Sequence, residues 1–130
     1  MSSIFTKIIN GDIPCYKIAE DAHYMAFLDV FPLKKGHTLI VPKKEIDYLF
    51  DLESETYLGL MDFSKKVAIA IKLAYPCKRI GMTVIGLEVP HAHIHLIPIS
   101  AMNDMNFSNE KLTLTKQEFE VCAENIKAFL

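Results

Sequence analysis

Three histidines alternate with apolar residues in the run HAHIH at positions 91–95, and this alternation constrains the fold more than any other feature of the chain. Successive side chains of an extended strand point to opposite faces of the sheet. The run therefore predicts a strand that places the histidines on one face and Ala92, Ile94 and Leu96 on the other, toward the core. Neighbouring imidazoles would lie about 6.5–7 Å apart, the length of two strand rises. Pro98 is expected to end the strand.

Turn residues and hydrophobic periodicity predict the remaining elements. Besides the strand over residues 91–97, strands are expected over residues 15–19, 23–30, 37–41 and 79–85. Helices are expected over residues 5–10, from an N-cap at Ser54 to Pro76, and from a capping box formed by Thr115 and Glu118 to about Phe129. Strands joined by short loops around a single long helix indicate the α+β class. We expect one domain over residues 1–130, in which a five-stranded antiparallel sheet carries the long central helix and the C-terminal helix.

The composition argues against several classes of partner. The chain has 130 residues, a net charge of -2 and a pI near 6.2, which gives no basic surface for nucleic acid or an anionic membrane. No stretch approaches the roughly 18 apolar residues of a membrane span. The cysteines (Cys15, Cys77 and Cys122) are odd in number and far apart, which argues against a disulfide framework and fits a reducing cytoplasm. We therefore expect a cytoplasmic protein with no nucleic-acid or membrane partner, in which a local pocket could still bind a nucleotide.

The histidine run by itself is compatible with three kinds of site. A neutral imidazole can attack phosphorus and form a phospho-histidine. It needs a hydrogen bond on its other ring nitrogen and donors, such as neighbouring protonated imidazoles, around the phosphoryl oxygens. Alternatively, two histidines two residues apart on a strand can share a metal ion. In the third case, the histidines occupy a solvated strand face.

A second run, Gly36–Pro42, places a fourth histidine, His37, at the start of a strand, and it follows the segment Ala26–Val30, which contains Asp29. Residues 91–97 match the pattern His-φ-His-φ-His-φ-φ, where φ is apolar, at every position. In these features, which extend over about residues 4–99, the chain resembles the histidine triad (HIT) superfamily. Within it, the chain is most similar to the small Hint branch and to its bacterial members.

The resemblance implies a protein that binds nucleoside phosphates and cleaves the bond between the α-phosphate and a leaving group. By similarity, His93 would be the nucleophile and would form a nucleotidyl-histidine intermediate. His91 would orient His93, and His95 and His37 would complete the polar surround of the α-phosphate. The implied substrates are purine nucleoside phosphoramidates or related adenylates, and the implied assembly is a homodimer that joins two sheets edge to edge. The chemistry itself would need no metal or other cofactor.

The resemblance also assigns the residues that bind the nucleoside. Asp29 would hold the ribose hydroxyls, since a carboxylate accepts two such donors. An apolar pocket for the base would be formed by Phe5, Ile8, Phe27, Leu28 and Val30. Each assignment has a structural alternative, because Asp29 could be a turn residue before Pro32 and the apolar residues could belong to the core.

One departure from the family pattern concerns zinc. Many members bind structural zinc through two cysteines near the N-terminus and a histidine after the Pro-Lys-Lys run, together with a triad histidine. The corresponding residues here are Ser3, Thr6 and Glu45. Because hydroxyl groups are poor zinc ligands, that zinc site is predicted to be absent.

The second departure is the loop before the triad, which is several residues shorter than usual. Ile85 and Leu87 stand near the positions of the usual Asn and Gln, which place amide donors on the phosphate. Glu88 could donate to a leaving group only if protonated, a state that a nearby bound phosphate favours. Loss of one preorganised donor costs on the order of a hundredfold in rate, so slow turnover or an unfamiliar leaving group is expected.

Rival functions stay open on the sequence. A nucleotide-binding module would bind nucleotides without turnover, and a dinucleoside polyphosphate hydrolase would act on a different leaving group. A metal-dependent enzyme would use His37, His91 and His93 as ligands. Chelation would abolish the activity of the metal-dependent enzyme and would leave a histidine nucleophile unaffected.

Overall fold

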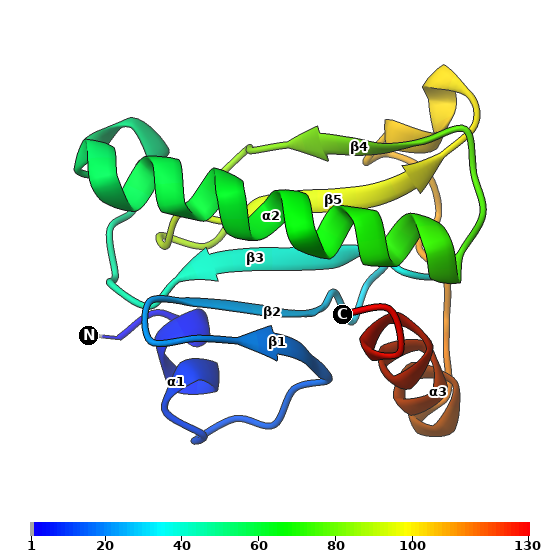
Figure 1. Cartoon of the computed structure of the whole chain (residues 1–130), viewed down its shortest axis with the longest axis horizontal. Coiled ribbons are helices and arrows are strands. Elements are labelled where there is room, and N and C mark those ends of the chain that lie inside the picture. The colour runs from blue at the N-terminus through cyan, green and yellow to red at the C-terminus, as the bar shows by residue number, and fades with distance from the viewer. Residues whose placement is uncertain (1) are drawn as a thin grey trace.

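The computed structural model describes residues 2–130 and places a five-stranded sheet at the centre of the molecule (Figure 1). Each strand is antiparallel to its neighbours, and the order is β1-β2-β3-β5-β4. The strands are β1 (Lys17–Glu20), β2 (Tyr24–Leu28), β3 (Thr38–Pro42), β4 (Arg79–Thr83) and β5 (Ile94–Ile99). The predicted α+β class and the predicted antiparallel sheet are confirmed.

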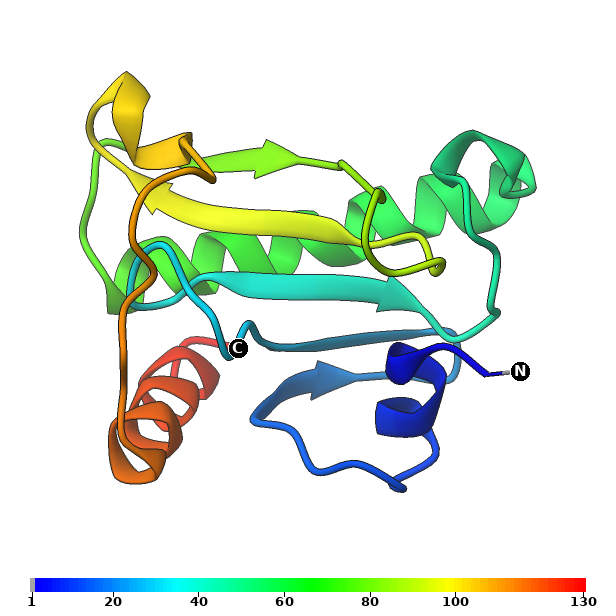
Figure 2. The ribbon, with the colours of Figure 1, turned by 180° about the vertical axis from the view of Figure 1, so that it is seen from behind.

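The helices cover the two faces of the sheet unequally. The long helix α2 (Ser54–Ala74) crosses one face. The helix α3 (Lys116–Lys127) packs near the C-terminal end of α2 and against β1 (Figure 1). The short helix α1 (Ile4–Ile9) lies on the opposite face, which Figure 2 shows from behind. Two 3-10 helices, η1 (Leu49–Asp51) and η2 (Met102–Met105), precede α2 and follow β5. Within residues 2–130, none of the helices has both the length and the apolar character that crossing a membrane requires.

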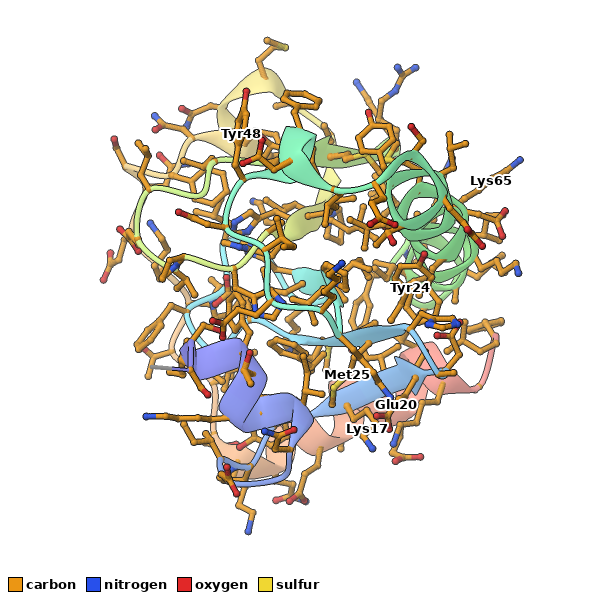
Figure 3. All side chains as sticks on the ribbon, turned by 90° about the vertical axis from the view of Figure 1, so that its left-hand side faces the viewer. Lys17, Glu20, Tyr24, Met25, Tyr48 and Lys65 are labelled. Carbon is orange, nitrogen blue, oxygen red and sulfur yellow. The ribbon has the colours of Figure 1, made fainter. Side chains whose placement is uncertain are left out.

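Alternation along β2 divides the apolar residues between two cores. Tyr24 belongs to the core under α2, whereas its neighbour Met25 belongs to the core under α1, and Figure 3 shows the two side chains from the side. The core under α2 combines alternate residues of the sheet with the inner faces of α2 and α3. The core under α1 consists of Phe5, Met25, Phe27, Leu39 and Val41. The central strands β2 and β3 are therefore buried on both faces.

The predicted capping box of α3 is confirmed, whereas the predicted N-cap of α2 is wrong. Thr115 and Glu118 exchange two hydrogen bonds of 3.1 Å each. Ser54 is the first helical residue of α2, and the N-cap is Glu53, whose side chain makes no capping bond. The reason is that the backbone carbonyl of Glu53 accepts from the N–H of Tyr57 at 2.9 Å, which starts the helix one residue earlier.

The strand predicted to carry all three histidines is displaced, and only His95 lies within it. It begins at Ile94 rather than at residue 91, because the backbone N–H of Ala92 bonds to the carbonyl of Ile46 at 2.7 Å, outside the sheet. It also continues through Pro98, which is tolerated because the ladder with β3 ends at Leu96 and leaves one side of the strand unpaired there. The other four strands end within two residues of their predicted limits.

Candidate active site

The face of the sheet opposite α2 carries a cavity of about 510 Å³ with mostly apolar walls. The walls come from α1 and the segment after it, from the end of β2 and from the loop before β5. A cavity of this volume suits a small-molecule ligand. His37 and His91 lie behind its lining. The predicted site residues that line it are Phe5, Ile8, Phe27, Leu28, Asp29, Val30, Glu88, His93 and His95.

His91 is fully buried, and its two ring nitrogens have different partners. Nε2–H donates to the carbonyl oxygen of Pro42 at 2.8 Å. Since a carbonyl can only accept, this bond places the proton on Nε2. Nδ1 then accepts from the hydroxyl of Ser3, also at 2.8 Å. Burial lowers the pKa of His91, which favours the neutral ring in this tautomer.

His93 takes the opposite tautomer. Its Nδ1–H donates to the backbone carbonyl of His91 at 2.7 Å, so that Nε2 carries the lone pair. Burial lowers the pKa of His93 as well, which keeps this lone pair free near neutral pH. The ring lines the cavity and packs edge-on against Phe5, with 4.9 Å between the centroids. An imidazole held in this way can attack an electrophile in the cavity.

A second chain of hydrogen bonds sets the tautomer of His95. The backbone N–H of Leu33 donates to Nδ1 of His37 at 3.0 Å, so the proton of His37 is on Nε2. That Nε2–H donates to Nδ1 of His95, again at 3.0 Å, which leaves the proton of His95 on Nε2. Burial lowers the pKa of His37 to about 3 and that of His95 to about 4. Near neutral pH, His95 therefore offers a neutral N–H donor beside the lone pair of His93.

These protonation states correct the expectation that charged imidazoles surround a phosphate. All four site histidines have a lowered pKa, and burial is the largest cause in each case. The donor in the cavity is thus the N–H of a neutral ring. The rings of His93 and His95 are also closer than the backbone spacing predicts, with 5.0 Å between their centroids.

The sequence left Asp29 either as a turn residue or as a ribose-binding residue. The structure places it both in a turn and at the cavity. Its Oδ1 accepts from the N–H of Phe31 at 2.8 Å, which forms a turn after β2. Its Oδ2 lies 3.4 Å from Nε2 of His37, and the side chain lines the cavity. Burial raises the pKa of Asp29, while the Phe31 bond and the charge of Lys111 lower it. One oxygen holds the turn, and the carboxylate still faces the cavity.

The apolar residues predicted to hold a base line the cavity and are also in or against the cores. Phe5 and Phe27 line the cavity and belong to the core under α1, and Leu28 belongs to the core under α2. Ile8 packs against the α1 core, and Val30 is 49% exposed at the cavity. The floor of the cavity is therefore the surface of the core itself.

Among the described residues, one group could hold a metal ion: Asp29, His37 and His95. Their potential ligand atoms all lie within 4.8 Å of one another. The nitrogens of the two rings are 3.0 Å apart and the ring centroids 5.2 Å apart, so each nitrogen points almost directly at the other. A zinc ion bound at about 2.0–2.1 Å to both nitrogens would require the two rings to turn until both lone pairs point at the ion. The geometry thus suits a shared proton better than an ion. His91, which the metal-dependent alternative also requires, has both ring nitrogens engaged in hydrogen bonds.

The residues that stand in place of zinc ligands form a hydrogen-bonded cluster with His91. The hydroxyl of Thr6 and the backbone N–H of Ser3 both donate to Oε1 of Glu45, each at 2.6 Å. The Ser3 hydroxyl accepts from the N–H of Thr6, which caps α1, and donates to His91. These bonds, led by the one from Thr6, lower the pKa of Glu45 to about 2. The cluster joins α1 to the triad through hydrogen bonds.

Two residues near the cavity were not predicted. Phe107 lines the cavity and packs edge-on against His95, with 5.0 Å between the centroids. Lys111 donates through Nζ to the carbonyl oxygens of Phe107 and Asn109, and its charge lowers the pKa of nearby Asp29. Both lie in the polar segment after β5, where a single phenylalanine among polar residues was the only signal in the sequence.

The burial of neutral histidines predicts that acid destabilises the fold. The pKa values of His37 and His95 are about 3 and about 4 in the folded chain, against an ordinary value of 6.5. Below pH 6.5 the unfolded chain therefore binds protons that the folded chain does not. The free energy of unfolding should fall as the pH decreases toward 4, by up to about 1.4 kcal/mol per pH unit for each histidine.

Urea unfolding at pH 6.5, 5.5 and 5.0 checks this dependence. The substitution His37→Asn should reduce the slope, because it removes one group that titrates only after unfolding. His23→Asn is the matched control, since His23 is exposed. A free energy of unfolding that stays constant over this range would contradict the assigned protonation states.

Comparisons with known proteins identify the family of the chain. The HIT domain model matches residues 10–102. The adenosine 5'-monophosphoramidase hnt1 of Schizosaccharomyces pombe is 40% identical over 99 residues, which cover 75% of this chain and 74% of that protein. A Hit-like protein of Bartonella henselae, described as involved in cell-cycle regulation, has a structure that superposes with a TM-score of 0.86 at 31% identity, covering 99% of this chain and 97% of that one. With a match over most of its length and relatives at this level of identity, the chain belongs to the HIT family.

Proposed function

We propose that this protein hydrolyses purine nucleoside phosphoramidates, adenosine 5′-phosphoramidates among them, or related adenylates, with His93 as the nucleophile. The observation that carries the proposal is the pairing of two rings in one apolar cavity. His93 has its lone pair on Nε2, and His95 has its proton on Nε2. The 40% identity to an adenosine 5'-monophosphoramidase supports the choice of bond and base.

The proposed reaction has two steps. In the first, Nε2 of His93 attacks the α-phosphorus, the P–N bond to the leaving group breaks, and the leaving nitrogen takes up a proton from solvent and departs as an amine. The Nε2–H of His95 donates to a phosphoryl oxygen whose charge grows in the transition state. In the second step, water attacks the phosphorus, the bond to Nε2 breaks, and the nucleoside monophosphate leaves while a proton goes to solvent. No metal ion takes part in either step.

The carbonyl of His91 would also stabilise the intermediate. Once Nε2 of His93 is bonded to phosphorus, the ring carries a positive charge, and its Nδ1–H still donates to that carbonyl at the 2.7 Å seen in the free site. Asp29 would accept from the ribose hydroxyls, and the apolar walls near Phe5 and Phe27 would hold the base.

A nucleotide-binding module without turnover is the second candidate. It is favoured by the wall formed by the loop before β5, where the side chains of Ile85, Leu87 and Val89 provide no hydrogen-bond donor. Preorganised donors around the phosphate contribute much of the rate of phosphoryl transfer. Measurements of binding and of cleavage of one adenosine phosphoramidate separate the two candidates.

Replacing His93 by alanine should lower the rate of cleavage of a fluorogenic adenosine phosphoramidate on the order of 10³-fold or more, because it removes the attacking nitrogen. The matched control is His23→Ala, at an exposed histidine outside the cavity. A chelator should leave the rate of the unaltered protein unchanged. Mass spectrometry of quenched reactions should find the nucleoside monophosphate on His93. Equal rates with and without His93 would contradict the mechanism, and binding without turnover would identify the module instead.

We also infer a homodimer, in a cytoplasmic setting consistent with the three separated thiols. The strand β4 is at the edge of the sheet, so one side of it has unpaired backbone groups. The neighbouring helix α2 exposes an apolar stripe at helical spacing: Leu58, Met61, Ile69 and Leu73. An open strand edge beside an apolar stripe favours pairing with a second copy.

Light scattering should give twice the chain mass of 14.8 kDa. The substitution Leu73→Glu should shift the mass toward that of one chain, because it places a charge in the apolar stripe. Val121→Glu, which changes an equally exposed apolar residue on α3, is the matched control. A mass of one chain for the unaltered protein at micromolar concentration would rule out the dimer.

A further inference from the structure

We propose that the cavity selects apolar organic amines without negative charge as leaving groups, and that Glu88 and the loop around it make this selection. The inference rests on the proposed function and adds to it the chemical class of the leaving group. It also argues against dinucleoside polyphosphates, whose leaving groups are anionic. Three observations carry it: the charges of the lining, the position of Glu88, and the exposed apolar side chains of the loop.

The charged residues of the described lining are both acidic. They are Asp29 and Glu88, and neither lysine nor arginine lines the cavity. Lys111 is close enough for its charge to affect Asp29 and His37, but its ammonium group is already bonded to two backbone carbonyl oxygens. A leaving group with its own negative charges would therefore meet no free cation in the cavity.

Glu88 shares the cavity with His93, the proposed nucleophile, and with Asp29. It lines the cavity, and its charge raises the pKa of both the nucleophile His93 and the carboxyl of Asp29. Because Glu88, Asp29 and His93 line the same cavity, this carboxylate acts on the substrate that the proposed reaction places there. It repels an anionic leaving group and attracts a cationic one. Because Glu88 is partly exposed to water, the effect of this charge on the reaction rate is limited to on the order of tenfold.

The loop that carries Glu88 adds an apolar surface. Leu87 is 89% exposed and Ile85 is 46% exposed, yet both line the cavity. The ring of Phe107 contributes a further apolar wall next to His95. Apolar side chains exposed at the mouth of a cavity gain from contact with an apolar ligand. An amine with a hydrocarbon substituent covers this surface, whereas ammonia or a polyphosphate does not.

A charge series of equal size tests the role of Glu88. The substrates are three adenosine 5′-phosphoramidates of phenethylamine, with hydrogen, an aminomethyl group or a carboxylate at the para position. For the unaltered protein, kcat/KM for the carboxylate compound should be about tenfold below that for the neutral compound, and the aminomethyl compound should equal or exceed the neutral one. Glu88→Gln should shrink the differences and Glu88→Lys should reverse them. Glu120→Lys, at an exposed position on α3, is the matched control.

A second comparison tests the apolar surface. The phenethyl compound should have a KM about tenfold lower than the unsubstituted phosphoramidate, whose leaving group is ammonia. Leu87→Asn should narrow this gap without affecting the fold, since Leu87 is 89% exposed. Val121→Asn, at an exposed apolar position on α3, should leave the gap unchanged.

Calorimetric binding of the same compounds to His93→Ala separates this inference from the proposed function. If the unaltered protein cleaves none of the compounds but binding to His93→Ala keeps the predicted order, the proposed function fails and the selectivity stands. If the carboxylate compound is bound and cleaved as well as the neutral one, or if Glu88→Lys leaves their ratio unchanged, the selectivity is overturned.

Discussion

The hydrogen bond from Nδ1–H of His93 to the carbonyl oxygen of His91 is the interaction on which the site depends. A backbone carbonyl cannot supply a proton, so the bond exists only in the tautomer that leaves the lone pair on Nε2. The position of the carbonyl depends in turn on the ring of His91, which is buried and held by Pro42 and Ser3. The nitrogen of His93 that carries the lone pair is thus set by backbone geometry two residues away.

The complementary donor is fixed by the same logic. The chain of bonds from the Leu33 N–H through His37 to His95 begins at a backbone group that can only donate. Each ring along it therefore has one possible tautomer while it is neutral. Burial keeps the rings neutral by lowering their pKa values, at the cost of stability in acid. A lone pair and an N–H donor consequently lie side by side in a cavity with mostly apolar walls, where charge that develops on a ligand interacts more strongly than in water.

The sequence predicted the parts of this arrangement that depend on local pattern. The period of two at residues 91–97 separated the histidines from Ile94 and Leu96, which are buried in the core under α2. The strand does not begin at residue 91, because Ala92 bonds to the distant carbonyl of Ile46, a contact that no local pattern reveals. The resemblance identified Ser3, Thr6 and Glu45 as the residues that replace zinc ligands, but their hydrogen bonds to one another and to His91 became visible only in three dimensions. Phe107 was missed for the same reason, since only the return of the polar segment over the cavity brings it to His95.

The tautomers of the four buried histidines provide the most direct test. Nitrogen-15 chemical shifts of the imidazole rings at pH 7 distinguish a protonated from an unprotonated nitrogen, and spectra of single histidine substitutions assign each ring. From the hydrogen bonds we expect the proton on Nδ1 of His93 and on Nε2 of His37, His91 and His95. A proton on Nε2 of His93, or a doubly protonated His93 or His95 ring at this pH, would contradict this assignment.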